Sequence, residues 1–140
     1  GLPREFDVLV MAGMGADTMV GILRGGPWLL RGGYRLVLQC QSSQNELRQF
    51  LSESGWTIIR EEPVRDGKFL YTVMEVIRQA GYSLTPGQCY FPPALEGNPS
   101  DVLTAYYRYV VQGLENIVLN RKALADPFAA QALEELRKIL

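Results

Sequence analysis

The stretch that decides the fold is Phe6–Met11, FDVLVM, followed at once by Ala12-Gly13-Met14-Gly15. A nearly all-apolar run rich in β-branched residues is typical of a parallel strand that is buried on both faces. The glycines after it predict a tight turn into a helix, which we expect Asp17 or Thr18 to cap. A strand, a turn and a helix in this order begin an α/β crossover unit.

The next segments continue this alternation. A helix is predicted to begin at Ser42 or Ser43, and Asp66-Gly67 is a strong hairpin-turn signal. Helices between strands imply right-handed crossovers and a parallel sheet, to which the hairpin adds one antiparallel strand. The further strands are predicted at Tyr34–Cys40, Trp56–Val64 and Lys68–Ile77.

The C-terminal part is predicted to be helical. Ser100 or Asp101 caps a long amphipathic helix over Val102–Lys122, and Asp126-Pro127 starts a second one. Two such helices joined by a short turn form a helical hairpin. We therefore divide the chain into an α/β part at residues 1–80, a linker or ordered loop at 81–99, and the helical hairpin at 100–140.

The composition excludes several kinds of active site and binding site. The 140 residues contain no histidine, which removes histidine-based nucleophilic machinery and histidine metal sites. Cys40 and Cys89 are too few for a disulfide framework, so we expect no metal and a reduced, cytoplasmic setting. The formal net charge of −1 is unlike that of a bare electrostatic nucleic-acid binder. No apolar stretch has the length of a membrane span.

The topology places a candidate site beyond the carboxyl ends of the strands. Gly13-Met14-Gly15 either forms the floor of a ligand pocket or makes a turn that binds nothing. Gln39 and Gln41 end the second strand, and we expect only one of them to face a pocket because side chains alternate. Lys68 is either a turn residue or a phosphate contact. Asp7, at the start of its strand, is expected to be structural.

Other residues with reactive or aromatic side chains favour structural roles. Cys40 is expected to be a small buried residue, since no histidine is present to activate it. Tyr106, Tyr107 and Tyr109 follow one another along the long helix, and we favour core packing over base stacking for them. FDVLVM would be a poor exposed edge strand. The chain is therefore expected to be the C-terminal part of a larger protein or to pair with another copy through that edge.

Four motifs in this order resemble the bacterial tRNA (adenine-22-N1)-methyltransferase family. The family has Ala-Gly-Met-Gly-Gly, Leu-Gln-Pro-Asn, a helical Leu-Arg and an Asp-Gly-Lys hairpin, and the resemblance covers essentially the whole chain. Ala16 stands where the family has its last glycine, and Cys40-Gln41 stands for Pro-Asn. The matching segments are Ala12–Ala16, Leu38–Gln41, Leu47-Arg48 and Asp66–Lys68.

This resemblance implies the C-terminal half of a class I, Rossmann-like methyltransferase sheet followed by the helical hairpin. It implies S-adenosylmethionine as cofactor, held mainly by a first half of the fold that is not found upstream of Phe6, and tRNA as partner. Ala12, Gly13, Met14 and Gly15 would line the cofactor boundary. Gln39, Gln41 and Lys68 would contact the substrate, and the resemblance assigns no catalytic residue. The chain by itself is then expected to be inactive.

Two other functions remain open from the sequence. The chain could be a non-catalytic interaction or oligomerisation module that uses its sheet edge and helical hairpin. It could also be a different α/β enzyme that completes its site across a dimer.

Overall fold

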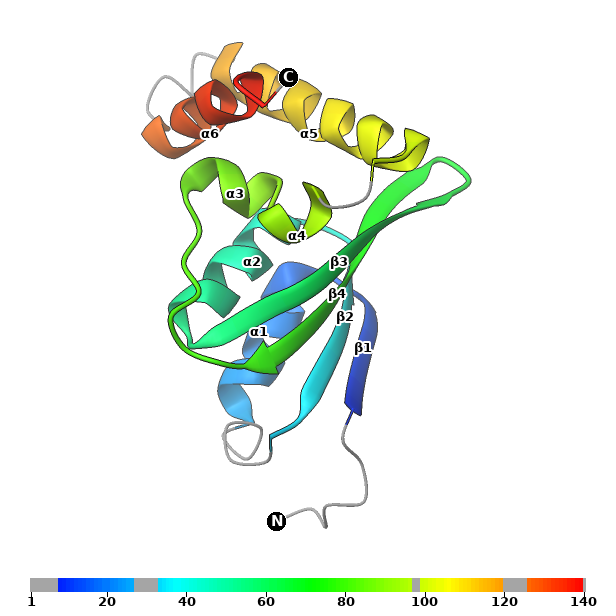
Figure 1. Ribbon diagram of the computed structural model, residues 1–140, viewed down its shortest axis with the longest axis vertical. Coiled ribbons are helices and arrows are strands. Elements are labelled where there is room, and N and C mark those ends of the chain that lie inside the picture. Colours follow the sequence, from blue (N-terminus) through cyan, green and yellow to red (C-terminus); the bar gives the residue numbers. More distant parts are fainter. Residues whose placement is uncertain (1–7, 27–32, 97–98, 120–125, 140) are drawn as a thin grey trace.

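The computed structural model describes residues 8–26, 33–96, 99–119 and 126–139. Asp7, the beginning of the first predicted strand and residues 120–125 lie outside these ranges. The described residues form one four-stranded sheet and six helices (Figure 1). In chain order these are β1 (Val8–Met14), α1 (Ala16–Gly25), β2 (Arg35–Cys40), α2 (Gln44–Glu53), β3 (Trp56–Asp66), β4 (Phe69–Arg78), α3 (Pro86–Tyr90), α4 (Pro93–Glu96), α5 (Asp101–Leu119) and α6 (Pro127–Arg137).

The sheet is mixed, with strand order β1-β2-β4-β3. β1 and β2 are parallel, whereas β4 pairs antiparallel with both β2 and β3. β1, β2 and β3 therefore run in one direction, and the hairpin places β4 between β2 and β3. This confirms parallel strands with one antiparallel strand from a hairpin, and Gly67 makes the turn at φ +58°.

The first strand is longer than predicted. β1 continues through Ala12 and Gly13 to Met14, with a bulge between Ala12 and Met14 where Gly13 has φ +77°. The helix after it consequently begins at Ala16 with Gly15 as its N-cap. The expectation that Asp17 or Thr18 caps this helix was wrong, because both residues already lie inside its first turn.

Two hydrophobic cores hold the described chain together. The first lies between the sheet and α1 and α2, where Met19, Leu38 and Leu47 are fully buried. The second joins α5 and α6 to the α3–α4 segment and contains Phe91, Leu95 and further side chains of both long helices. In Figure 1, α5 lies across the end of the sheet at which the β3–β4 hairpin turns, and α6 lies beside α5 over α3.

The helical hairpin follows the predicted signals. Ser100 Oγ accepts a hydrogen bond from the Leu103 N–H at 3.0 Å, and Asp126 Oδ1 accepts one from the Ala129 N–H at 3.1 Å. The segment predicted as linker or loop contains α3 and α4, which were not predicted. A capping box between Thr85 and Gln88 starts α3. The division at 80 and 99 stays a prediction.

Candidate functional site

The carboxyl ends of β1 and β2 are joined into one surface by hydrogen bonds. The Gly13 N–H donates to Gln39 Oε1 at 2.7 Å. The Gln41 N–H donates to the Met14 carbonyl at 2.8 Å, and the Ala16 N–H donates to the Ser42 carbonyl at 3.2 Å. The predicted cofactor segment, Ala12–Gly15, is therefore fixed against the predicted substrate segment.

Glycine is required in this turn for two separate reasons. Gly13 adopts a left-handed conformation, which side chains with a Cβ disfavour, although a Cβ there would meet no atom within 4 Å. Gly15 has an ordinary φ of −76°, but a Cβ on it would lie 2.8 Å from Ser42 Oγ. The space beside Gly13 is thus open, and Gly15 permits the close approach of β1 to the end of β2.

Replacing Gly13 with alanine is expected to lower the free energy of unfolding by about 1–2 kcal/mol, the cost of a left-handed L-residue. Gly21 is the matched control, because it lies in α1 and a Cβ added to it would meet no atom within 4 Å. Gly21→Ala is expected to raise the stability by about 0.5–1 kcal/mol. Urea unfolding of both variants measures the two values, and equal effects would contradict the assigned role of Gly13.

A pocket of about 280 Å³ lies beside this turn and brings the predicted substrate residues together. Gln39 and Gln41 reach it from the end of β2, and Lys68 reaches it from the β3–β4 hairpin. Asp66 and Tyr109 also line it. The expectation that only one glutamine could face a pocket was wrong. Strand alternation puts residues two apart on the same face, and Gln41 follows directly after the last residue of β2.

The four predicted cofactor residues do not line this pocket in the described chain. Ala12, Gly13, Met14 and Gly15 lie next to it, and Gln39 connects the two groups through its bond to Gly13. The structure therefore unites Gln39, Gln41 and Lys68 in one cavity, and the glycine turn lies outside its lining, connected to it through Gln39. No cluster of metal-binding side chains occurs among the described residues. No described helix is both long and apolar enough to cross a membrane.

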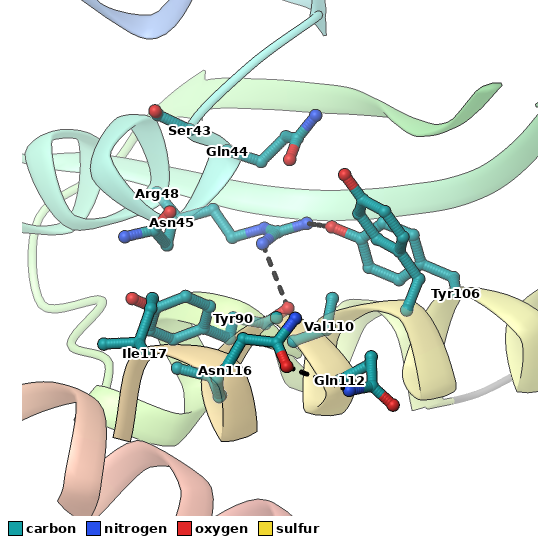
Figure 2. A pocket seen from close by; sticks show the side chains of 13 residues that line it. Ser43, Gln44, Asn45, Arg48, Tyr90, Tyr106, Val110, Gln112, Asn116 and Ile117 are labelled. Carbon is teal, nitrogen blue, oxygen red and sulfur yellow. Dashed lines mark hydrogen bonds between the residues drawn. The ribbon is translucent and has the colours of Figure 1, made fainter. Parts of the chain in front are cut away.

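A second pocket of about 390 Å³ lies between α2 and α5 (Figure 2). It shares Ser43, Gln44 and Tyr109 with the first pocket, so the two cavities are neighbours. Ser43 is the N-cap of α2 and has a φ of +56°, which is uncommon for a residue other than glycine. The predicted site thus extends further toward the helical hairpin than the sequence indicated.

A buried ionic network, whose partners are distant in the sequence and were not predicted, lies behind the second pocket. Arg48 on α2 is 1% exposed and binds both carboxylate oxygens of Glu61, with Nη2–Oε2 at 2.5 Å and Nε–Oε1 at 3.2 Å. Arg48 also donates to the Tyr106 hydroxyl at 2.8 Å and to the Cys89 and Tyr90 carbonyls at 2.8 and 3.1 Å. Figure 2 shows Arg48 between α2 and Tyr106 of α5.

The Arg48 guanidinium remains charged in this interior. Burial lowers the pKa of Arg48, but the charge of Glu61 and the hydrogen bonds that Arg48 donates to Glu61 and Tyr106 raise it by more. Thr72 Oγ1 donates to Glu61 Oε2 at 2.5 Å, so that carboxylate is also satisfied. One side chain therefore joins the sheet, α2, α3 and α5. The sequence signal for it was an arginine directly beside the buried Leu47–Leu51 stripe of its helix.

The three tyrosines of α5 have separate environments. Tyr106 and Tyr107 are buried, and the Tyr107 hydroxyl donates to the Leu136 carbonyl at 2.7 Å, so core packing is confirmed for both. Tyr109 is 61% exposed and borders both pockets. Packing thus explains two of the three, and Tyr109 presents an aromatic face to the candidate site.

Both cysteines are buried, as expected for Cys40. Burial raises the pKa of the Cys40 thiol, which donates to the Ser42 carbonyl at 3.0 Å. Burial also raises the pKa of Cys89 to about 11. Neither thiol has the depressed pKa or the exposure of a nucleophilic cysteine.

The sheet order, the helices packed on one of its faces and the pocket at the strand ends define a Rossmann-like α/β protein. The model of the TrmK family, tRNA (adenine(22)-N(1))-methyltransferase, matches residues 2–139. The chain therefore belongs to the tRNA (adenine(22)-N(1))-methyltransferase family.

Individual relatives agree with this family. A Mycoplasma pneumoniae protein assigned as a tRNA methyltransferase is 32% identical over 136 residues, which are 94% of this chain and 59% of the relative. The Streptococcus pneumoniae Sp1610 structure in complex with S-adenosyl-L-methionine superimposes with a TM-score of 0.76 at 26% identity, over 96% of this chain and 63% of that one.

The Bacillus subtilis m1A22 tRNA methyltransferase TrmK shares the fold, with a TM-score of 0.67 at 24% identity over 95% of this chain and 59% of that one. The 140 residues thus span about three fifths of the relatives that they match.

Proposed function

We propose that these residues form the RNA-binding half of an S-adenosylmethionine-dependent methyltransferase that modifies N1 of an adenine in tRNA. The observation that carries the proposal is the convergence of Gln39, Gln41 and Lys68 on one pocket beside the Gly13 turn. Family membership supplies the reaction class, and a tRNA substrate belongs in the cytoplasm.

The residues that are present fit one wall of a cofactor site. The space beside Gly13 is open, since a Cβ added there would meet no atom within 4 Å. Typical dinucleotide-like cofactor sites also need a glycine-rich turn after a first strand and an acidic residue about 20 positions later. The described residues hold no such pair, so we propose that most cofactor contacts come from the part of the family fold outside these 140 residues.

Bound S-adenosylmethionine would supply a methyl group on a positively charged sulfur. The protein's part is then positional: the adenine must be held with N1 in line with that methyl group. N1 of adenine carries a lone pair that would accept the methyl group directly, so no side chain would have to remove a proton from N1 first. The carboxamides of Gln39 and Gln41 can hydrogen-bond the edge of an adenine, and Lys68 can pair with a phosphate.

The proposal explains the apolar edge of the sheet. In the described chain β1 pairs with β2 alone, and Val10 is 64% exposed on it. We propose that this edge receives a strand from the rest of the family fold. Self-association of the 140 residues through the same edge is the alternative, and it would favour an interaction module over an enzyme.

Calorimetric titration with S-adenosylmethionine tests the proposal that most cofactor contacts come from outside these 140 residues. We expect the 140-residue chain to show no binding in the micromolar range and to be inactive by itself. A chimaera in which these residues replace the matching part of the Mycoplasma pneumoniae relative is expected to bind. Micromolar binding by the 140 residues would contradict this proposal, and a folded chimaera that does not bind would contradict the cofactor assignment.

A further inference from the structure

The pocket between α2 and α5 has the chemistry of a binding site, and the reaction proposed above does not use it. Its cavity of about 390 Å³ is within the range of small-ligand sites. Four carboxamide side chains and three aromatic rings supply its polar and flat surfaces. They are Gln44, Asn45, Gln112, Asn116, Tyr90, Tyr106 and Tyr109.

The charges around this pocket favour a neutral ligand. Arg48 is the one ionised side chain among the described residues that line it, and Glu61, the Tyr106 hydroxyl and two carbonyls already occupy its donors. Gln112 Nε2 donates to Asn116 Oδ1 at 3.1 Å and Gln44 Nε2 donates to the Cys40 carbonyl at 3.0 Å. Each carboxamide has two N–H donors and an oxygen with two lone pairs, so donors and acceptors remain for a ligand. A flat ligand with apolar faces and a mixed donor–acceptor edge matches this lining, whereas a phosphate does not.

The position of the pocket identifies the ligand further. Ser43, Gln44 and Tyr109 border this cavity and also the cavity that holds Gln39, Gln41 and Lys68. A polymer with one unit in the first pocket can therefore place a neighbouring unit in the second. Unpaired RNA bases are commonly recognised by stacking on aromatic rings and by hydrogen bonds to their edges.

We propose that the pocket between α2 and α5 binds an unpaired nucleobase directly adjacent to the adenine that is methylated. Tyr109 stacks on this base at the boundary between the pockets, and the carboxamides of α2 and α5 contact its edge. The inference rests on the proposed function, because it takes RNA as the polymer.

Side-chain carboxamide signals of the ¹⁵N-labelled 140-residue chain can report on the two pockets separately. The probes are a single-stranded RNA pentanucleotide with a central adenine and the same RNA lacking the base on one side or the other of that adenine. We expect the intact RNA to shift Gln39 and Gln41 together with Gln112 and Asn116. Removing one of the two neighbouring bases is expected to abolish the shifts of Gln112 and Asn116 alone.

The outcomes separate this inference from the proposed function. Suppose that RNA shifts the signals of Gln39 and Gln41, but that the signals of Gln112 and Asn116 shift equally with all three RNAs or with none. The inference then fails and the proposed function stands. If only Gln112 and Asn116 shift, and only with the base present, the nucleobase pocket stands and the adenine site fails. Shifts in neither pocket overturn both.

Variants test the same pocket by affinity. Tyr109→Leu is expected to weaken RNA binding roughly 5- to 150-fold, the range for loss of one base–aromatic stack, whereas Tyr109→Phe retains binding. Gly113 lines the pocket, and a Cβ added to it would meet no atom within 4 Å. The leucine side chain of Gly113→Leu therefore occupies part of the cavity. This variant is expected to weaken binding without loss of stability, because leucine is a better helix former than glycine.

Gln131 on α6 is exposed and lines neither pocket, so Gln131→Ala is the matched control for Gln112→Ala. We expect a loss of affinity in the Gln112 variant alone. Unchanged RNA affinity in Tyr109→Leu and Gly113→Leu together would overturn the nucleobase pocket.

Discussion

Glu61→Ala is expected to lower the free energy of unfolding by about 3–5 kcal/mol, because it leaves the Arg48 charge buried without its partner. Arg48 is 1% exposed and Glu61 is 2% exposed, so water cannot replace the missing carboxylate without opening the structure. The loss also removes the acceptor of the Thr72 hydroxyl. Urea unfolding followed by circular dichroism measures the change.

The neighbouring glutamate provides a matched control. Glu62 pairs with Arg60 at 3.1 Å, but the two side chains are 41% and 68% exposed. Exposed ion pairs of this kind contribute about 0–1 kcal/mol, so Glu62→Ala should be nearly neutral. Similar losses in the Glu61 and Glu62 variants would contradict the role given to burial.

A double variant distinguishes the ion pair from the wider network. In many proteins, replacing both partners of a buried pair with apolar residues is close to neutral. Here Arg48→Met with Glu61→Leu is expected to remain destabilising, because the Cys89 and Tyr90 carbonyls lose their donor as well. Full recovery of stability in the double variant would show that those carbonyl contacts contribute little.

The second large effect is expected on activity. Gln39→Ala in the Mycoplasma chimaera should lower kcat/KM for methyl transfer about 100-fold, the scale on which misplacing a substrate acts. The Gln39 side chain makes two contacts. Its Oε1 accepts a hydrogen bond from the Gly13 N–H, and the side chain also lines the pocket proposed for adenine. Gln39→Ala removes both contacts, so neither the Gly13 turn nor the adenine is held in position by this side chain.

Gln39→Glu separates the two contacts. Glutamate can still accept from the Gly13 N–H, but it lacks the NH₂ donor, so stability should be kept while kcat/KM falls. Gln79→Ala is the control, because Gln79 is exposed beyond the end of β4 and lines neither of the two pockets. Full activity in both Gln39 variants would remove this residue from the substrate site.

Local signals predicted most of the secondary structure. Alternating apolar strands and amphipathic helices, the Asp66-Gly67 turn and the Asp126-Pro127 helix start are all found in the structure. These features depend on residues that are close in the sequence, which is why a single sequence reveals them. The first helix start was misplaced because the bulge at Gly13 extends β1 before the chain turns.

The features that were missed depend on contacts that are distant in the sequence. Arg48 meets Glu61, Thr72, Cys89 and Tyr106, and no local pattern indicates that these segments share one interior. Tyr106 and Tyr109 lie three residues apart on one helix, yet only packing against α2 and α3 decides which is buried. The same packing forms the second pocket, so the sequence could indicate Gln39, Gln41 and Lys68 but not their neighbours on α5.

The central claim is that these residues position an adenine of tRNA for methylation at N1. Its most direct test is to incubate unmodified tRNA with the chimaera and S-adenosylmethionine, digest the tRNA to nucleosides and identify the product by mass spectrometry. The account predicts 1-methyladenosine, in an amount that Gln39→Ala strongly reduces. A methyl group on another base, or unmodified tRNA from a chimaera that binds the cofactor, would contradict it.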